Sequence, residues 1–121
     1  MTAQPLDYAQ AKEGARKIAE RRRGATGKLE TAIKEAAAAE AEYRKSLSRR
    51  IVELRDAGVA ATACEAQAKG EDGIAFLLAE RDVKAGMIAV QQSHISEIEG
   101  ERASFHRLME WSMKLNAMGV Q

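Results

Sequence analysis

The stretch LRDAGVAATACE, from Leu54 to Glu65, separates two long helical tracts and decides the fold. Gly58 can adopt the left-handed backbone conformation that ends many helices. Further on, Thr62 and Glu65 have the spacing of a capping box, in which a hydroxyl and a carboxylate satisfy free backbone N–H groups at a helix start. The sequence therefore predicts a turn at residues 56–62 between two helices.

The tract before this turn carries one apolar stripe at alternating spacings of three and four residues, the pattern of a helix with one buried face. We expect a first helix from about Asp7 to Ala57, bent or interrupted at Gly24–Gly27, because each glycine costs about 1 kcal/mol relative to alanine in a helix. The stripe comprises Leu29, Ile33, Ala36, Tyr43, Leu47, Ile51 and Leu54, with Glu40 among them, and a weaker upstream face comprises Ala11, Ala15, Ile18 and Ala19.

The tract after the turn repeats the same spacing and is expected to end at Gly119. Gly70 and Gly73 could divide it into a short helix, about Ala63 to Lys69, and a long one. The predicted fold is an all-α, coiled-coil-like helical hairpin, forming a single domain over residues 7–121 after a flexible segment at residues 1–6. The second apolar seam comprises Ile74, Leu77, Arg81, Ala85, Ile88, Ile95, Ile98, Arg102, Phe105 and Met109.

Composition agrees with this class. Charged residues make up 31% of the 121 residues and aromatic residues 4%, which is typical of long helices and argues against a β-rich core. Cys64 is the only cysteine, so no intrachain disulfide is possible. No apolar run approaches the roughly 20 residues that span a bilayer, and the start MTAQPLDYAQ lacks the apolar region of a signal peptide. We therefore expect a cytoplasmic protein that does not enter a membrane.

A two-helix hairpin buries only one seam per helix, and broad apolar surface lies beside the seam. That surface comprises Phe76, Leu78, Met87, Val90, Leu108, Trp111, Met113 and Leu115. We expect a second copy to cover it, so that a homo-dimer or higher oligomer completes a bundle of helices. The residues predicted for the oligomer interface are Leu47, Ile51, Leu54, Ile88, Ile95, Ile98, Phe105 and Met109.

Charge is distributed unevenly along the chain. Residues 1–56 hold 13 Lys/Arg and 9 Asp/Glu, a net charge of +4, whereas residues 57–121 hold 6 and 9, a net charge of −3. Clustered cations can neutralise phosphates or an acidic protein surface. Alternatively, they form a solvated face or pair with the acidic second half. The candidate binding residues are Arg21, Arg22, Arg23, Lys28, Arg44, Lys45, Arg49 and Arg55.

No catalytic, metal or cofactor site is expected. The run RRRGATGKLE, from Arg21 to Glu30, resembles a phosphate-binding loop, but only two residues separate its glycines and Leu29 stands where a hydroxyl is required. Cys64 has no histidine nearby in sequence to act as a base. His94 and His106 lack the repeated Glu-x-x-His pattern of bundle metal sites.

Four charged residues fall at or next to seam positions, namely Glu40, Arg50, Arg81 and Arg102. Polar groups in a helical seam can fix register and oligomeric state. If Arg81 or Arg102 lined a pocket between copies, it could instead accept an anion.

The run from Tyr43 to Asn116 resembles the small helical proteins encoded by bacteriophages and prophages, with one helix ending at Gly58 and the next spanning Ala63 to Trp111. The resemblance implies a role near DNA replication or recombination, or the binding and inhibition of a host protein. We expect a non-enzymatic interaction protein that binds a host or phage protein by surface complementarity. The alternatives are a nucleic-acid-binding accessory factor and an oligomeric sponge for anionic nucleotides.

Overall fold

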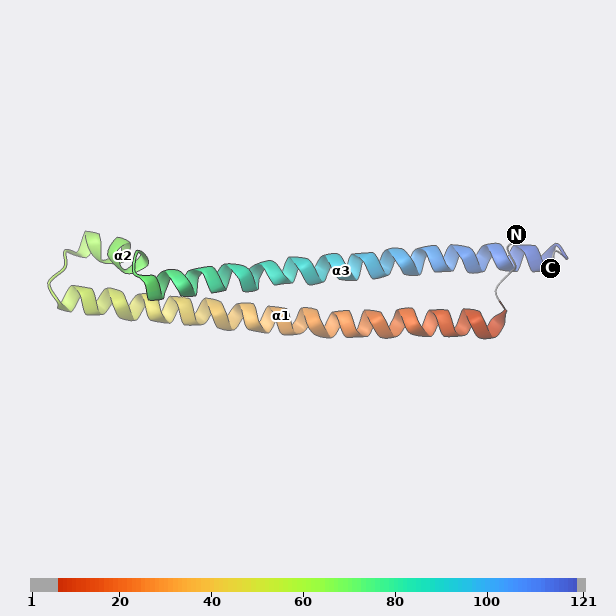
Figure 1. The fold of residues 1–121 in the computed structure, drawn as a ribbon, viewed down its shortest axis with the longest axis horizontal. Helices are drawn as coiled ribbons and strands as arrows, with labels where there is room; N and C mark the ends of the chain where they lie inside the picture. Colours follow the sequence, from red (N-terminus) through yellow and green to blue (C-terminus); the bar gives the residue numbers. More distant parts are fainter. Residues whose placement is uncertain (1–6, 120–121) are drawn as a thin grey trace. The chain divides into compact units, whose positions relative to one another are not determined.

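The computed structural model describes residues 7–119, which form three helices and no strand (Figure 1). Helix α1 spans Tyr8–Asp56, α2 spans Ala61–Lys69 and α3 spans Asp72–Ala117. The prediction of an all-α hairpin in which one long helix packs against another is confirmed. The flexible segment predicted at residues 1–6 lies outside the described residues.

Helix α1 is not interrupted at Gly24–Gly27. Ala25, between the two glycines, is buried, and the Thr26 hydroxyl donates a hydrogen bond of 3.0 Å to the backbone oxygen of Arg22 one turn earlier. Burial of this face offsets the intrinsic cost of two glycines, because packing overrides propensity in long helices.

The end of α1 confirms the role of Gly58, which has a φ of 93°. Its N–H donates to the backbone oxygen of Arg55, and the N–H of Val59 donates to that of Leu54, both at 3.0 Å. This pair of bonds is a Schellman motif, whose usual apolar contact is also present because Val59 packs against the cluster containing Leu54.

The predicted capping box is wrong. Helix α2 begins at Ala61 with Ala60 as its N-cap, and no side chain makes a capping hydrogen bond there. Thr62 therefore lies inside the helix. The start of α2 follows instead from burial, because Cys64 and Ala68, one turn apart, both lie in the core. The alternative of a short helix before a long one is confirmed, since α2 ends at Lys69 and α3 begins at Asp72.

The chain forms two compact units, each containing a stretch of α1 against a stretch of α3. The turn unit comprises Leu29–Val90 and includes all of α2. The terminal unit comprises the residues up to Lys28 and those from Gln91 onward. In the turn unit Glu40 and Glu35 contact Arg81 and Lys84, and in the terminal unit Arg21 and Arg22 contact Glu101 and Glu99, so α1 and α3 run antiparallel in each unit.

In the turn unit the seam is displaced by one residue at two places. Ile33, predicted to be inside, is 48% exposed, whereas Ala32 is buried. Ala85 is exposed, and Lys84 beside it turns toward α1. At the first place, the small Ala32 lets the helices approach closely where hydropathy favours the larger Ile33. At the second, Lys84 replaces Ala85 because its ammonium group contacts Glu35.

In the terminal unit the contact depends on a glycine. The Phe105 ring packs so closely on Gly14 that a Cβ there would lie 2.5 Å from Cζ of the ring. Ala15 and Ala19, predicted for this face, are exposed. Arg102 also leaves the predicted seam, with 64% of its side chain exposed.

Candidate interaction surface

The first basic cluster is partly neutralised within the chain. In the terminal unit, Arg21 forms an ion pair with Glu101, with Nη2 at 3.1 Å from Oε1, and Arg22 pairs with Glu99. The Arg21 contact lowers the pKa of Glu101 and raises that of Arg21, in each case chiefly through their hydrogen bond. The alternative that basic residues pair with the acidic second half is therefore found for these two.

The remaining candidate cations are exposed on α1. Arg44 forms an ion pair with Glu40 at 2.7 Å. Five others lie on the surface and form no ion pair within residues 7–119, namely Arg23, Lys28, Lys45, Arg49 and Arg55. Tyr43, the aromatic residue nearest the second cluster, is buried and cannot stack on a base. The exposed cations thus form no combined basic and aromatic surface.

The charged residues of the turn-unit seam pair with one another. Arg81 lies over the Tyr43 ring, 4.8 Å from its centre, and contacts Glu40 at 3.3 Å. Lys84 reaches Glu35 at 3.1 Å. A shift of one helix along the other would break these contacts, so they fix the register of α1 against α3. The sequence identified Arg81 and Glu40 separately but not as partners.

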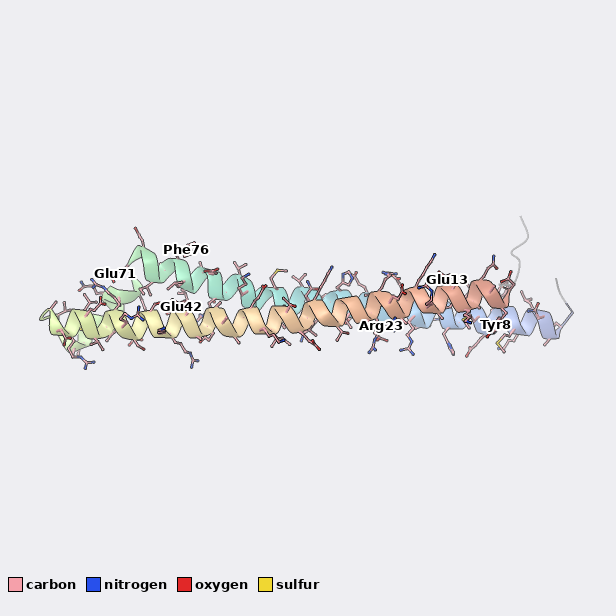
Figure 2. All side chains as sticks on the ribbon, turned by 90° about the horizontal axis from the view of Figure 1, so that it is seen from below. Tyr8, Glu13, Arg23, Glu42, Glu71 and Phe76 are labelled. Atoms are coloured by element: carbon pink, nitrogen blue, oxygen red, sulfur yellow. The ribbon has the colours of Figure 1, made fainter. Side chains whose placement is uncertain are left out.

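Arg50 connects α1 to the short segment between α2 and α3. Its Nε and Nη2 donate to the two carboxylate oxygens of Glu71, at 2.6 and 2.9 Å, and its Nη1 contacts Glu53 at 3.0 Å. The Glu71 hydrogen bond is the main cause of the raised pKa of Arg50, and it lowers the pKa of Glu71. Figure 2 shows Glu71 at this end of the turn unit. The contact is structural.

Cys64 packs in the core of the turn unit with Leu54 and Ala68, and only 1% of its surface is exposed. Its thiol lies 3.3 Å from the backbone oxygen of Ala60. His106 pairs with Glu110 at 3.2 Å on the surface of α3. No group of three or more potential metal ligands occurs in the part of the chain that the structure describes. In the structure, Cys64 is thus a packed core residue and His106 contacts a carboxylate on the surface.

The residues predicted for the oligomer interface line the interior of the chain itself. Leu54 and Ile98 are 4% and 1% exposed, which leaves them almost no surface for a second copy. The other six are half-buried, namely Leu47, Ile51, Ile88, Ile95, Phe105 and Met109. The most exposed apolar side chains of the described residues therefore lie at other positions.

Exposed apolar side chains gather on α3 in both units. In the turn unit we define the first flank as Phe76, Val83, Met87 and Val90, which are 67, 65, 40 and 55% exposed. In the terminal unit we define the second flank as Leu108 and Trp111 of α3 together with Met118, which directly follows the last residue of α3; they are 45, 46 and 74% exposed. Figure 2 labels Phe76 on α3.

Sequence reasoning identified most of the flanks and missed Val83 and Met118. The signal that would have found them is the seven-residue spacing from Phe76 to Val83 and from Trp111 to Met118. Leu78 and Leu115, which were expected beside the seam, are half-buried, whereas Met113 is 67% exposed.

Two hollows lie in the terminal unit. A shallow groove of about 770 Å³ borders the second flank, and its lining includes Ile18, Ser104, Phe105, Arg107 and Leu108. A pocket of about 430 Å³ lies between α1 and α3, and its lining residues are Asp7, Tyr8, Ala11, Met109, Ser112, Met113 and Asn116. Neither lining includes a histidine or a cysteine that could act as a base or nucleophile.

Within residues 7–119, none of the helices has the length and apolar character needed to cross a membrane. No family model, curated protein or solved structure matches the chain. The interpretation of the surface therefore depends on its own chemistry.

Proposed function

We propose that this chain is a non-enzymatic helical interaction protein that associates with other helices through the exposed apolar flanks of α3. Its action is surface complementarity and not bond chemistry. The chain first binds copies of itself to form a dimer or higher oligomer. A host or phage protein is the proposed further partner.

The observation that carries the proposal is that the flanks are exposed, and that more large hydrophobic side chains are exposed than are buried in the core. Eleven large hydrophobic residues of the described chain are exposed, whereas the large hydrophobic residues of the core are Tyr43, Leu54, Ile74 and Ile98. Clustered exposed apolar surface on a soluble chain marks an interaction site, unlike single scattered side chains. Two amphipathic helices commonly bury such surface in a bundle.

Pairing of Arg21 and Arg22 with α3 counts against the nucleic-acid alternative at these two positions, because paired cations have less charge to offer phosphates. Arg81, one of two arginines considered for an anion pocket, is likewise engaged with Glu40 and Tyr43. Both features favour the hypothesis of a protein-interaction function over an oligomeric sponge for anionic nucleotides and over a nucleic-acid-binding accessory factor.

Sedimentation equilibrium of the full chain at micromolar concentration tests the proposal. We expect a mass of two chains or more, which falls toward one chain on dilution. A mass of one chain throughout the micromolar range would contradict self-association. In parallel, filter binding of short single- and double-stranded oligonucleotides at low and moderate salt tests the alternative, and salt-sensitive retention would favour the accessory factor.

A further inference from the structure

The two flanks occupy equivalent positions along α3. Phe76, Val83 and Val90 are seven residues apart, and continuing in steps of seven leads to Trp111 in α3 and to Met118 just after its end. A seven-residue step returns to the same side of a helix in a coiled coil. The first and second flanks therefore share the same spacing of apolar side chains and differ mainly in the charges beside them.

The border of the first flank is acidic. Glu80 lies within it, is exposed and forms no ion pair with any residue of the described chain. The basic residues nearby are Arg81 and Lys84, and both turn toward α1, where they pair with Glu40 and Glu35. The negative charge of Glu80 is therefore available to a partner.

The border of the second flank is basic. Arg107 and Lys114 are exposed beside Leu108 and Trp111. Of the acidic side chains of this stretch, Glu101 pairs with Arg21 and Glu110 contacts His106, so the two cations exceed the one carboxylate charge that is not paired with an arginine or lysine. The second flank thus offers apolar side chains with free positive charge.

We propose that the first flank of one copy packs antiparallel on the second flank of a second copy, with Glu80 of each facing Lys114 of the other. This inference rests on the proposed self-association and names its surface. Each copy carries both flanks, so the same contact forms twice and closes a twofold dimer. Apolar burial stabilises the contact, and the charges select its register.

The register follows from the spacing. When Glu80 faces Lys114 of the second copy, Val83 faces Trp111 and Phe76 faces Met118. Met87 and Val90 then reach the shallow groove beside Ser104 and Leu108. A methionine side chain is flexible enough to fill such an irregular hollow.

The flanks do not pair well with themselves. If the first flanks of two copies packed together, the Glu80 side chains of both copies would lie near each other, with no unpaired cation beside them. A second flank against a second would bring Arg107 near Lys114. Like charges in such contacts oppose association, whereas first against second pairs opposite charges. Charge complementarity therefore selects the second copy in the crossed arrangement.

Charge reversal in the full chain tests the proposal. Glu80→Lys alone and Lys114→Glu alone should each weaken dimerisation, by about tenfold in Kd, because each places two like-charged pairs in the interface. An equal mixture of these two variants should restore near-wild-type affinity, since the mixed dimer contains only opposite pairs. Glu30→Lys and Lys34→Glu are the matched controls, because both are exposed on α1 without an ion pair in residues 7–119.

Sedimentation equilibrium gives the Kd, and circular dichroism confirms that every variant keeps its helices. A wild-type mass of one chain overturns both this inference and the proposed self-association. A dimer whose affinity changes equally in the Glu80→Lys variant and the Glu30→Lys control overturns only the crossed docking of the flanks. Failure of the mixture to recover affinity overturns it as well.

Discussion

The turn unit and the terminal unit use the same two-helix contact but close it differently. In the turn unit, α2 covers the end of the seam, and Cys64 and Ala68 pack on Leu54. In the terminal unit no third helix is present among the described residues, and the seam relies on Ile98 and the close contact of Gly14 with Phe105. The turn unit should therefore be the more stable of the two.

The comparison also separates two uses of charge. In the turn unit, Arg50 and Arg81 lie in or near the seam, with 38 and 31% of their side chains exposed. In the terminal unit, Arg21 and Arg22 lie at the edge, with about half of their side chains exposed. Exposed pairs contribute little to stability. Ion pairs thus fix the register of α1 against α3 in the turn unit, and they contribute less to stability in the terminal unit.

The largest expected losses of stability come from truncating a buried side chain in the core of each unit. Leu54→Ala and Ile98→Ala should each lower the free energy of unfolding by about 2–5 kcal/mol, because both side chains are almost fully buried. Amide hydrogen exchange should show the loss of protection mainly in the unit that carries the change. Val52→Ala, at a side chain that is 50% exposed, is the control. Uniform loss of protection along the chain would show that the two units unfold as one.

Two of the glycines in the terminal unit's part of α1, Gly14 and Gly24, should respond differently to substitution by alanine. Gly24→Ala should stabilise the chain by about 1 kcal/mol, since nothing lies within 4 Å of the added Cβ. Gly14→Ala should be less stable than Gly24→Ala by about 1–2 kcal/mol, because the Phe105 ring must move.

Urea denaturation measures this difference between the two glycine variants. Adding Phe105→Leu to both should remove most of it. Equal stabilisation by both alanines in the presence of Phe105 would contradict the close contact.

Acid should weaken one contact in each unit. The folded-state pKa values of Glu71 and Glu101 lie below the ordinary 4.5, chiefly because of their hydrogen bonds to Arg50 and Arg21. A lowered carboxyl pKa contributes stability that is present above the ordinary value and lost as the pH falls through the folded-state pKa. The Tm should therefore decline as the pH is lowered below 4.5. Glu71→Gln should flatten that decline, and an unchanged profile would contradict the role of the Arg50 contact.

The smallest expected effect is at the exposed edge of the terminal unit. Arg22→Gln removes the pair with Glu99 and should lower the free energy of unfolding by less than about 1 kcal/mol. Arg23→Gln, at an exposed position, is the matched control. A larger loss, measured by urea denaturation, would mean that the edge pairs hold the terminal unit together.

Periodicity predicted the architecture because spacings of three and four residues directly reflect the geometry of a helix. The role of Gly58 could be predicted because a helix end that needs a left-handed residue favours glycine, whatever the rest of the fold. The one-residue shift at Ile33 could not be predicted, because hydropathy favours a large side chain where the close approach of two helices favours a small one. The shift at Ala85 has a different cause, since Lys84 reaches α1 through its contact with Glu35.

Pairing across the hairpin was also out of reach. Arg21 and Glu101 are 80 residues apart, and which acid meets which base depends on the register of α1 against α3. The predicted oligomer residues were placed in the seam because the strongest apolar pattern is the one that the chain buries for itself. The exposed flanks have a weaker pattern, and only the seven-residue spacing marks Val83 and Met118 as part of them.

The environment of Trp111 tests the central claim most directly, because it is the only tryptophan and is 46% exposed in the single chain. Its fluorescence should shift to shorter wavelength and resist acrylamide quenching as the concentration rises, with the same midpoint as the mass. A spectrum and quenching constant that do not change while the mass doubles would contradict the docking of the second flank.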